Sequence, residues 1–565
     1  MSHISLWDIL KFTVKGLDYK FEQYRLNTGA TVTTKIAKGE VKGAKRMSVW
    51  GNSYYSFEGI PFAKPPLGEL RFKAPVEEDP WDGVLDCTGP ANVPFQGNMI
   101  FKKYKGSEDC LYLNVFTNDI TPSAPRPVMV WIYGGGFQLG EATRDMYSPD
   151  YFMSKDVVLV TIAYRLGPFG FLSFDDPSVD IPGNAGIKDQ IMALKWVQKN
   201  IAAFGGDPNN VTLFGESAGG TSTHLCMVSE QSKGLIHKAI TMSGSMLCPW
   251  ALPPQNQWAY RLAKALGYDG EEKATEIYQF LKTVSPIEIQ KATPTILNKE
   301  EKHNRVMFAF GPVIEPYRTK DCIIADSPLE LMKTSWSNDI PMILGGTSFE
   351  GLLFYPEVMR RKATLDEVGD CANLLPLDLG IDKRSTKAHE LGLSLKKAYF
   401  GEEECSINTI MKFLELCSYR EFWHPIYRTA LYRMQFARAP TYVYRFDYDS
   451  ADSNAIRRLL CGDAVRGACH GDDMVYLFRF MFSHRMPMDS QDCKVSKTMI
   501  DVWTSFAATS DPNCASLGDV KYEPLGKDTT TIKCLNISNK VDFIDLPELE
   551  KIKEVWNSFY PQGKL

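Results

Sequence analysis

The chain has 565 residues and a mass of 63.7 kDa, with 44% hydrophobic and 23% charged residues. This composition is ordinary for a globular protein and excludes a wholly disordered chain. The net charge of −5 and the isoelectric point of about 6.0 give no reason to expect nucleic acid as the main partner.

The cysteines and the first residues bear on where the protein resides. The thirteen cysteines are scattered without a CxxC pair, so a structural zinc site is not expected. The N-terminus carries Asp8, Lys11 and Lys15 before any apolar run of signal-peptide length. The apolar runs Val128–Tyr133 and Val157–Tyr164 are far shorter than the roughly 20 residues of a transmembrane helix. We therefore expect a cytoplasmic protein.

Residues 1–28 are predicted to form an N-terminal amphipathic helix, because apolar residues recur there at alternating spacings of three and four. These residues are Trp7, Leu10, Val14, Leu17, Phe21 and Tyr24. Such a helix either packs on the body of the protein or makes peripheral contact with a membrane or lipid-droplet surface, since lysines flank the stripe and aromatic residues lie on it. The sequence alone does not separate the two.

Short strands are predicted next. The alternating segments Thr31–Ile36 and Glu40–Arg46 are typical of a hairpin, and the proline-rich segment Ile60–Pro75 is typical of an irregular loop. The runs Val128–Tyr133 and Val157–Tyr164 are continuously apolar, as expected of strands buried on both faces of a parallel sheet.

Strands and helices then alternate along the chain. Further strands are predicted at Val211–Phe214, Lys238–Ser243, Pro341–Leu344 and Thr441–Phe446, and helices over Ala185–Ala203 and from Ser217 onward. This order predicts an α/β fold with a large, mostly parallel central sheet flanked by helices. The long segments between Trp250 and Ile340 and between Leu352 and Pro440 are expected to be helical insertions that cap the same domain, so residues 29–565 should form a single domain.

The strongest chemical signal is the pentapeptide Gly215-Glu216-Ser217-Ala218-Gly219. It follows a predicted strand directly and opens a predicted helix, which is the setting of a nucleophile elbow. The serine of such a turn is strained and exposed, so the residues two positions away must lack bulk. We interpret Ser217 as a nucleophile rather than as part of a simple glycine-serine turn.

Three consecutive glycines, Gly134, Gly135 and Gly136, follow the predicted strand Val128–Tyr133. Backbone N–H groups at this place can face the elbow and stabilise a developing oxyanion. We therefore interpret the glycine run as an oxyanion-hole loop rather than as a flexible turn.

A nucleophilic serine in this fold class is followed in the chain by an acid and then by a histidine. His470 is the first choice of base, because it lies in a glycine-punctuated loop late in the chain, whereas His224 lies on the helix that carries it away from Ser217. Glu350 follows the strand predicted at Pro341–Leu344, at the carboxyl edge of the sheet where such sites are built. Many other carboxylates are available, so the acid is less well defined by the residues alone.

With these residues in place, the sequence resembles the type-B carboxylesterase/cholinesterase family over about residues 39–558. Besides the pentapeptide, the resemblance rests on motifs within Glu108–Val115, Gly183–Gln190, Phe204–Pro208, Gly346–Gly351 and His470–Phe478. The nearest likeness within the family is to the insect α-esterases, which are intracellular detoxifying carboxylesterases associated with insecticide resistance.

The resemblance implies an α/β-hydrolase fold and a serine esterase that hydrolyses uncharged carboxylic esters (xenobiotic, fatty-acyl or lipid esters) without a metal or a cofactor. Ser217 would be the nucleophile, His470 the general base and acid, and Glu350 the carboxylate that orients the histidine. The expected partners are small-molecule ester substrates, and organophosphate inhibitors that would phosphorylate the serine.

The resemblance also assigns residues around the nucleophile. Gly135, Gly136 and Ala218 would donate the hydrogen bonds of the oxyanion hole. Trp250 and Phe308 resemble residues that line the acyl pocket of the family, with ordinary core positions as the alternative.

Three cysteine and tyrosine positions bear on how far the family pattern holds. The resemblance implies a disulfide between Cys87 and Cys110, although a cytosolic location would favour the reduced thiols. Tyr133 stands before the glycine run where many relatives have histidine, so the hydrogen bonding behind the oxyanion hole is expected to differ.

Four other functions are weighed against the carboxylesterase. Choline-ester hydrolysis is disfavoured because the segment Cys87–Cys110 holds three lysines and no tryptophan for a cation–π contact. Juvenile-hormone esterases usually carry glutamine where this chain has Glu216. A non-catalytic family member would have lost the serine, which is present here. A sequestering esterase that acylates quickly and deacylates slowly stays open.

Overall fold

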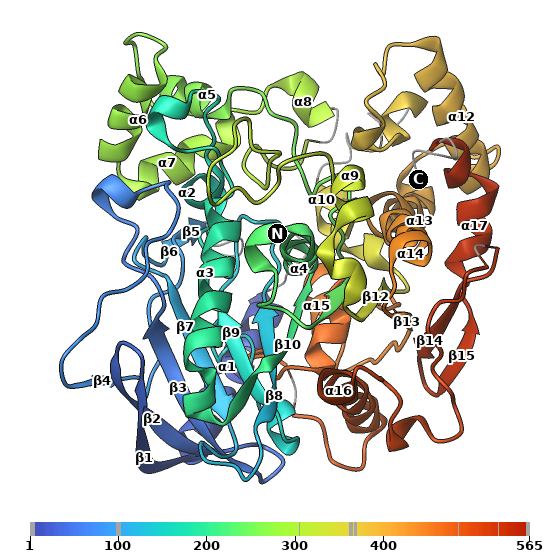
Figure 1. Ribbon diagram of the computed structural model, residues 1–565. Helices are drawn as coiled ribbons and strands as arrows, with labels where there is room; N and C mark the ends of the chain where they lie inside the picture. The colour runs from blue at the N-terminus through green and yellow to red at the C-terminus, as the bar shows by residue number, and fades with distance from the viewer. Residues whose placement is uncertain are drawn as a thin grey trace.

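The computed structural model describes residues 6–97, 103–303, 306–360, 365, 370–483, 485–528 and 530–560 (Figure 1). A thirteen-stranded sheet runs through the molecule in the order β1-β2-β3-β7-β9-β8-β10-β11-β12-β13-β14-β15, with β4 beside β2. Its strands are β1 (Asn27–Ile36), β2 (Gly39–Met47), β3 (Ser53–Pro61), β4 (Val84–Asp86), β7 (Tyr112–Thr117), β8 (Arg126–Ile132), β9 (Val158–Ile162), β10 (Gly206–Glu216), β11 (Lys238–Met242), β12 (Met342–Thr347), β13 (Thr441–Phe446), β14 (Lys533–Ile537) and β15 (Val541–Asp545). A separate pair is formed by β5 (Gln96–Gly97) and β6 (Tyr104–Lys105).

The centre of the sheet is parallel and its edges are antiparallel. Neighbouring strands are parallel throughout the central run β9-β8-β10-β11-β12-β13-β14. On one side of this run, β1, β2, β3 and β7 pair antiparallel with one another in that order, and β7 pairs antiparallel with β9. On the other side, β15 pairs antiparallel with β14. Every residue of β9, β11 and β12 is buried, which explains why the central strands read as continuous apolar runs. The predicted mostly parallel α/β sheet is confirmed.

Helices flank the sheet and fill the two predicted insertions. The α-helices are α1 (Leu6–Arg25), α2 (Gly167–Phe171), α3 (Ala185–Asn200), α4 (Ala218–Val228), α5 (Trp258–Ala265), α6 (Ala274–Thr283), α7 (Pro286–Ala292), α8 (Lys299–His303), α9 (Pro328–Thr334), α10 (Tyr355–Arg360), α12 (Thr386–Phe400), α13 (Ile410–Ser418), α14 (His424–Phe436), α15 (Ala455–Cys461), α16 (Gln491–Thr509) and α17 (Glu548–Glu554). Figure 1 shows α5, α6 and α7 at the upper left of the view, α8 at the top centre and α12 at the upper right, with α13 and α14 below α12. Of the helices described, none is both long enough and apolar enough to cross a bilayer.

The N-terminal helix α1 packs on the body through a different face from its apolar stripe. Its buried residues are Gly16, Tyr19 and Gln23, and the Tyr19 hydroxyl donates to the Arg144 carbonyl at 2.9 Å. The stripe residues Val14, Leu17, Phe21 and Tyr24 are instead 48, 65, 65 and 79% exposed. The side chains of Trp7 and Leu10 lie outside the described residues. The helix therefore packs on the body, as the first of the two alternatives has it, but the stripe residues between positions 14 and 24 do not face the body.

The disulfide implied by the family resemblance is not formed in this structure. Cys87 and Cys110 are both free thiols, and both are buried. Burial raises the pKa of Cys87 to about 12 and the pKa of Cys110 well above its usual range. Because disulfide formation proceeds through the thiolate, this burial opposes oxidation of the pair.

Candidate active site

Ser217 occupies the sharp turn between β10 and α4 that its pentapeptide predicts. Its backbone angles of φ 57° and ψ −124° are costly for a residue with a side chain. The turn is fixed on both sides: the Ser217 N–H donates to the Met242 carbonyl of β11 at 2.8 Å, and the Thr221 N–H of α4 donates to the Ser217 carbonyl at 2.9 Å. Ser217 is only half-buried, although its neighbours on both sides are buried.

Two glycines of the pentapeptide are required by close backbone contacts. A Cβ atom on Gly219 would lie 2.1 Å from the Ile132 carbonyl oxygen at the end of β8. A Cβ atom on Gly215 would lie 2.5 Å from the Gly219 carbonyl carbon. Side chains at either position would therefore push the helix away from the sheet and displace the serine.

The glycine run after β8 lies directly against Ser217. A Cβ atom on Gly134 would be 2.9 Å from the Ser217 Cβ, and Gly135 and Gly136 have φ angles of 110° and 60° that favour glycine. Within the described part of the chain, the N–H groups of Gly135, Gly136 and Ala218 donate to no backbone or side-chain acceptor. Three donors beside one hydroxyl are thus available to bind an oxyanion.

Tyr133, which precedes the glycine run, forms reciprocal hydrogen bonds with a second tyrosine, Tyr164. Its hydroxyl donates to the Tyr164 carbonyl at 3.1 Å, and the Tyr164 hydroxyl donates to the Tyr133 carbonyl at 3.0 Å. The two rings stack with centroids 4.6 Å apart. These reciprocal contacts fix the strand end from which the glycine loop begins.

Glu350 and His470 meet at the same edge of the sheet, although 120 residues separate them. The His470 Nδ1 lies 2.6 Å from the Glu350 Oε2. The other carboxylate oxygen of Glu350 accepts from the Ser243 hydroxyl at 2.6 Å and from the Thr347 N–H at 2.7 Å. Glu350 is fully buried, so these contacts fix its carboxylate and, through it, the orientation of the imidazole.

A second carboxylate faces the other side of the imidazole. The His470 Nε2 lies 3.1 Å from the Glu216 Oε1, and no hydrogen bond joins Ser217 to His470 among the described contacts. Burial raises the pKa of Glu216 to about 8. Burial alone would lower the pKa of His470, but the charges of Glu216 and Glu350 outweigh it and raise this pKa to about 9.

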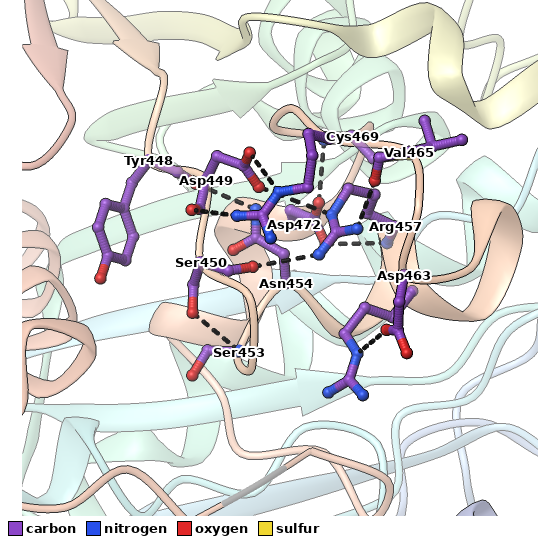
Figure 2. A network of polar contacts seen from close by, with 12 residues as sticks. Tyr448, Asp449, Ser450, Ser453, Asn454, Arg457, Asp463, Val465, Cys469 and Asp472 are labelled. Carbon is purple, nitrogen blue, oxygen red and sulfur yellow. Dashed lines mark hydrogen bonds and ion pairs between the residues drawn. The ribbon is translucent and has the colours of Figure 1, made fainter. Parts of the chain in front are cut away.

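The loop that carries His470 is held by buried charged groups (Figure 2). The Asp472 carboxylate accepts from the Cys469 N–H at 2.9 Å and from the Arg457 N–H at 3.1 Å. The Arg457 guanidinium in turn donates to the carbonyls of Val465 at 2.5 Å and Ser450 at 3.2 Å. Arg457 and Asp472 are both fully buried, and their contacts connect α15, the loop of His470 and the segment that follows β13.

Comparison with known proteins identifies the family. The model of the carboxylesterase family matches residues 29–553. The chain belongs to the carboxylesterase family. It is 38% identical to Esterase B1 of Culex pipiens, over 95% of this chain and 99% of that protein, and 35% identical to a juvenile hormone esterase of Tribolium castaneum, over 84% and 83%.

A solved structure supports the fold assignment of this carboxylesterase. The crystal structure of juvenile hormone esterase from Manduca sexta, with OTFP covalently attached, matches with a TM-score of 0.83 and 28% identity. It covers 94% of this chain and 100% of that one. The predicted α/β-hydrolase fold and the predicted esterase class are therefore confirmed.

Both predicted pocket residues of the carboxylesterase lie beside this site. A Cβ atom on Gly136 would be 2.5 Å from the Phe308 ring, so that ring covers the glycine run. The Trp250 indole N–H donates to the Glu421 carbonyl at 3.1 Å. Trp250 and Phe308 line one pocket, while Trp250 is also buried in the hydrophobic core and Phe308 packs against that core.

Several side chains at the site carry no signal in the sequence. Phe422 packs its ring 4.5 Å from the His470 ring, and it belongs to a π-helical turn, Tyr419–Trp423, inside a segment predicted only to be helical. Ser243 acts on the site through Glu350, which is 107 residues away in the chain, and Arg457 acts through carbonyls of the neighbouring loop. Among the described residues, no group of three or more His, Cys, Asp and Glu is arranged to hold a metal ion.

Proposed function

We propose that this carboxylesterase hydrolyses uncharged carboxylic esters through an acyl-enzyme on Ser217. The observation that carries the proposal is the set of unused N–H donors of Gly135, Gly136 and Ala218 around the half-buried serine. These donors suit the tetrahedral intermediate of acyl transfer, in which an ester carbonyl becomes an oxyanion.

The proposed reaction has two halves. His470 accepts the proton of the Ser217 hydroxyl as the oxygen attacks the ester carbonyl, while Glu350 stabilises the imidazolium through its 2.6 Å contact with Nδ1. The intermediate collapses when His470 gives that proton to the departing alcohol. Water then attacks the acyl-serine with the same histidine as base, which releases the acid and restores the serine. Every group comes from residues 29–565, which we propose to act as one catalytic domain.

A burst of product tests the acyl-enzyme. With p-nitrophenyl butyrate, we expect rapid release of one p-nitrophenol per active site, followed by slower steady turnover. A burst followed by almost no turnover would instead favour the sequestering alternative. The absence of both burst and turnover would contradict the proposal.

The substrate class is proposed to be uncharged esters, as in detoxification by the insect α-esterases. The pocket beside Ser217 is lined largely by apolar side chains such as Val306 and Leu375, which suits fatty-acyl, lipid and xenobiotic esters. Butyrate esters should therefore turn over faster than acetylthiocholine. The chain is also similar to two juvenile hormone esterases, so juvenile-hormone hydrolysis is the alternative function. Faster hydrolysis of juvenile hormone than of simple butyrate esters would support that alternative.

We also propose that the cytoplasmic enzyme rests on a phospholipid surface through α1. The side chains of Leu17, Phe21 and Tyr24 are 65, 65 and 79% exposed on one stripe, and the opposite face of the helix is already packed on the body. Exposed apolar patches of this kind commonly mark a surface that binds a membrane or another protein. Lys15 and Lys20 on the same helix would favour anionic lipid.

Flotation with vesicles of phosphatidylcholine and phosphatidylserine tests this contact. We expect the wild type to float with the vesicles and the double variant Leu17→Ser/Phe21→Ser to stay in solution. Asp18→Ser changes an exposed residue between the two and serves as the matched control. Equal flotation of all three proteins, or none by the wild type, would contradict the contact.

A further inference from the structure

The pocket near the proposed nucleophile has a buried ion pair in its wall. Its walls include the apolar side chains of Trp250, Phe308, Val306 and Leu375, together with Arg420 and Glu421. The Arg420 Nε donates to the Glu421 Oε1 at 2.5 Å, and the two side chains are only 3 and 5% exposed. Stability alone does not account for the pair, because the free energy of removing two charges from water commonly exceeds the gain from their attraction. A functional role would explain a charged pair in an otherwise apolar wall.

The pocket adjoins the reacting groups on two sides. The Phe308 ring covers Gly136 of the glycine run. The Trp250 ring lies 5.9 Å from the Phe422 ring, which itself lies 4.5 Å from the His470 ring. A substituent of an ester bound at Ser217 can therefore enter this pocket and approach the ion pair in its wall.

The π-helical turn Tyr419–Trp423 places the pair at the pocket. Successive residues of the turn supply Arg420 and Glu421 to the wall, Phe422 to the histidine, and Trp423, whose indole N–H donates to the Thr347 carbonyl at 2.9 Å. Single π-helical turns of this kind occur often at functional sites. One irregular turn thus joins the pocket wall to the histidine and to the end of β12.

The hydrogen-bonding capacity of the pair is only partly used. The other described donations of the Arg420 guanidinium go to the Leu374 carbonyl at 3.3 Å and to the Cys417 sulfur at 3.5 Å. A guanidinium has five N–H groups, so donors remain on Nη1 and Nη2. No described hydrogen bond reaches the Glu421 Oε2. The pocket wall therefore offers both a donor and an acceptor.

We propose that this pocket selects esters whose acyl or alcohol chain ends in a neutral hydroxyl group, bound between Arg420 and Glu421. A hydroxyl can donate to Glu421 and accept from Arg420 at the same time. A substrate chain that ends in a methyl group would displace water from the ion pair without replacing the hydrogen bonds of that water. Binding of such a substrate is therefore disfavoured. A carboxylate would meet the charge of Glu421, and an ammonium would meet that of Arg420. The inference rests on the proposed hydrolysis at Ser217.

Two matched substrate series test the inference. One compares p-nitrophenyl hexanoate with p-nitrophenyl 6-hydroxyhexanoate, and the other compares hexyl butyrate with 6-hydroxyhexyl butyrate. In one series, the hydroxylated ester should have a kcat/KM about tenfold higher, which is the effect of one hydrogen bond to a charged group. The series that responds identifies whether the acyl or the alcohol chain enters the pocket.

Substitution of the pair should remove this preference. Arg420→Met/Glu421→Gln keeps the volume and removes both charges, so its ratio of kcat/KM values should fall to about one or below. Glu421→Gln alone provides a milder variant if the double variant folds poorly. Arg445→Met/Glu548→Gln is the control, because it removes another buried ion pair, of 2.7 Å, between β13 and α17.

The outcomes separate this inference from the proposed function. No preference in either wild-type series, or a preference that survives in the Arg420 and Glu421 variants, would overturn the hydroxyl pocket while leaving hydrolysis intact. Failure of all four esters to turn over, with no acyl burst, would instead contradict the proposed function.

Discussion

The two halves of the candidate site are held in place by different physical means. Ser217 is fixed by short-range backbone geometry, since its turn depends on Gly215 and Gly219 and on hydrogen bonds to β11 and α4. His470 is fixed by side-chain contacts, namely Glu350 on the ring, from 120 residues away in the chain, and the nearby Arg457 network that holds the loop. Local substitutions should therefore damage the first half through sterics and the second half through unpaired charge.

The largest effect is expected where the chemistry depends on a single atom. Ser217→Ala removes the proposed nucleophile, and kcat should fall roughly 10⁶-fold, as in other serine hydrolases. The melting temperature should stay close to that of the wild type, because the backbone of the turn is unchanged. Ester hydrolysis that survives at more than a few per cent of wild-type kcat would contradict the role of Ser217.

Glu350→Gln probes the side-chain half of the comparison directly. The amide keeps the shape of the carboxylate but cannot stabilise the imidazolium, so kcat should fall about 10⁴-fold. Glu548→Gln is the matched control, because Glu548 is also buried and hydrogen-bonded to an arginine but has no described contact with Ser217 or His470. Equal losses in the two variants, measured with p-nitrophenyl butyrate, would indicate a general structural effect.

Arg457→Met should destabilise the loop of His470 rather than remove a reacting group. The carbonyls of Val465 and Ser450 would lose their buried donor and Asp449 would lose an ion pair, at a cost of about 3–5 kcal/mol in the free energy of unfolding. Arg438→Met breaks an exposed pair with Asp339 and should cost less than about 1 kcal/mol. Urea unfolding measures both variants, and similar costs would mean that the network does not support the loop.

The smallest expected effect is a shift of the pH profile. His470 must be neutral to accept the serine proton, and its pKa of about 9 means that kcat/KM should rise with pH toward that value. Glu216→Gln removes one of the negative charges that raise the pKa of His470. The pKa should therefore fall, and the acidic limb of the profile should move to lower pH. A limb that stays in place or moves upward would contradict the influence of Glu216.

The same contrast explains what the sequence could predict of the fold. Buried central strands such as β8 and β9 were predictable because strands covered on both faces are continuously apolar. The strands β7, β14 and β15 escaped prediction, since short or mixed segments gain their strand structure from neighbours in the sheet. The exposure of the apolar stripe of α1 was not predictable either, because sequence periodicity defines an apolar face but does not show whether that face contacts protein or solvent.

The candidate site divides in the same way. Ser217 and the glycine run lie in short motifs whose backbone demands are visible in consecutive residues. His470 and Glu350 could be selected by chain order and family resemblance. The contacts of Ser243 and of the turn Tyr419–Trp423 join residues far apart in the chain, and only the folded structure brings these together.

Covalent labelling by an organophosphate tests the central claim most directly. Intact mass after stoichiometric diethyl phosphorylation should show one adduct, peptide mapping should locate it on Ser217, and esterase activity should fall in proportion to the labelled fraction. Ser217→Ala should remain unlabelled. No adduct on the active wild type, or an adduct that persists in Ser217→Ala, would contradict the account.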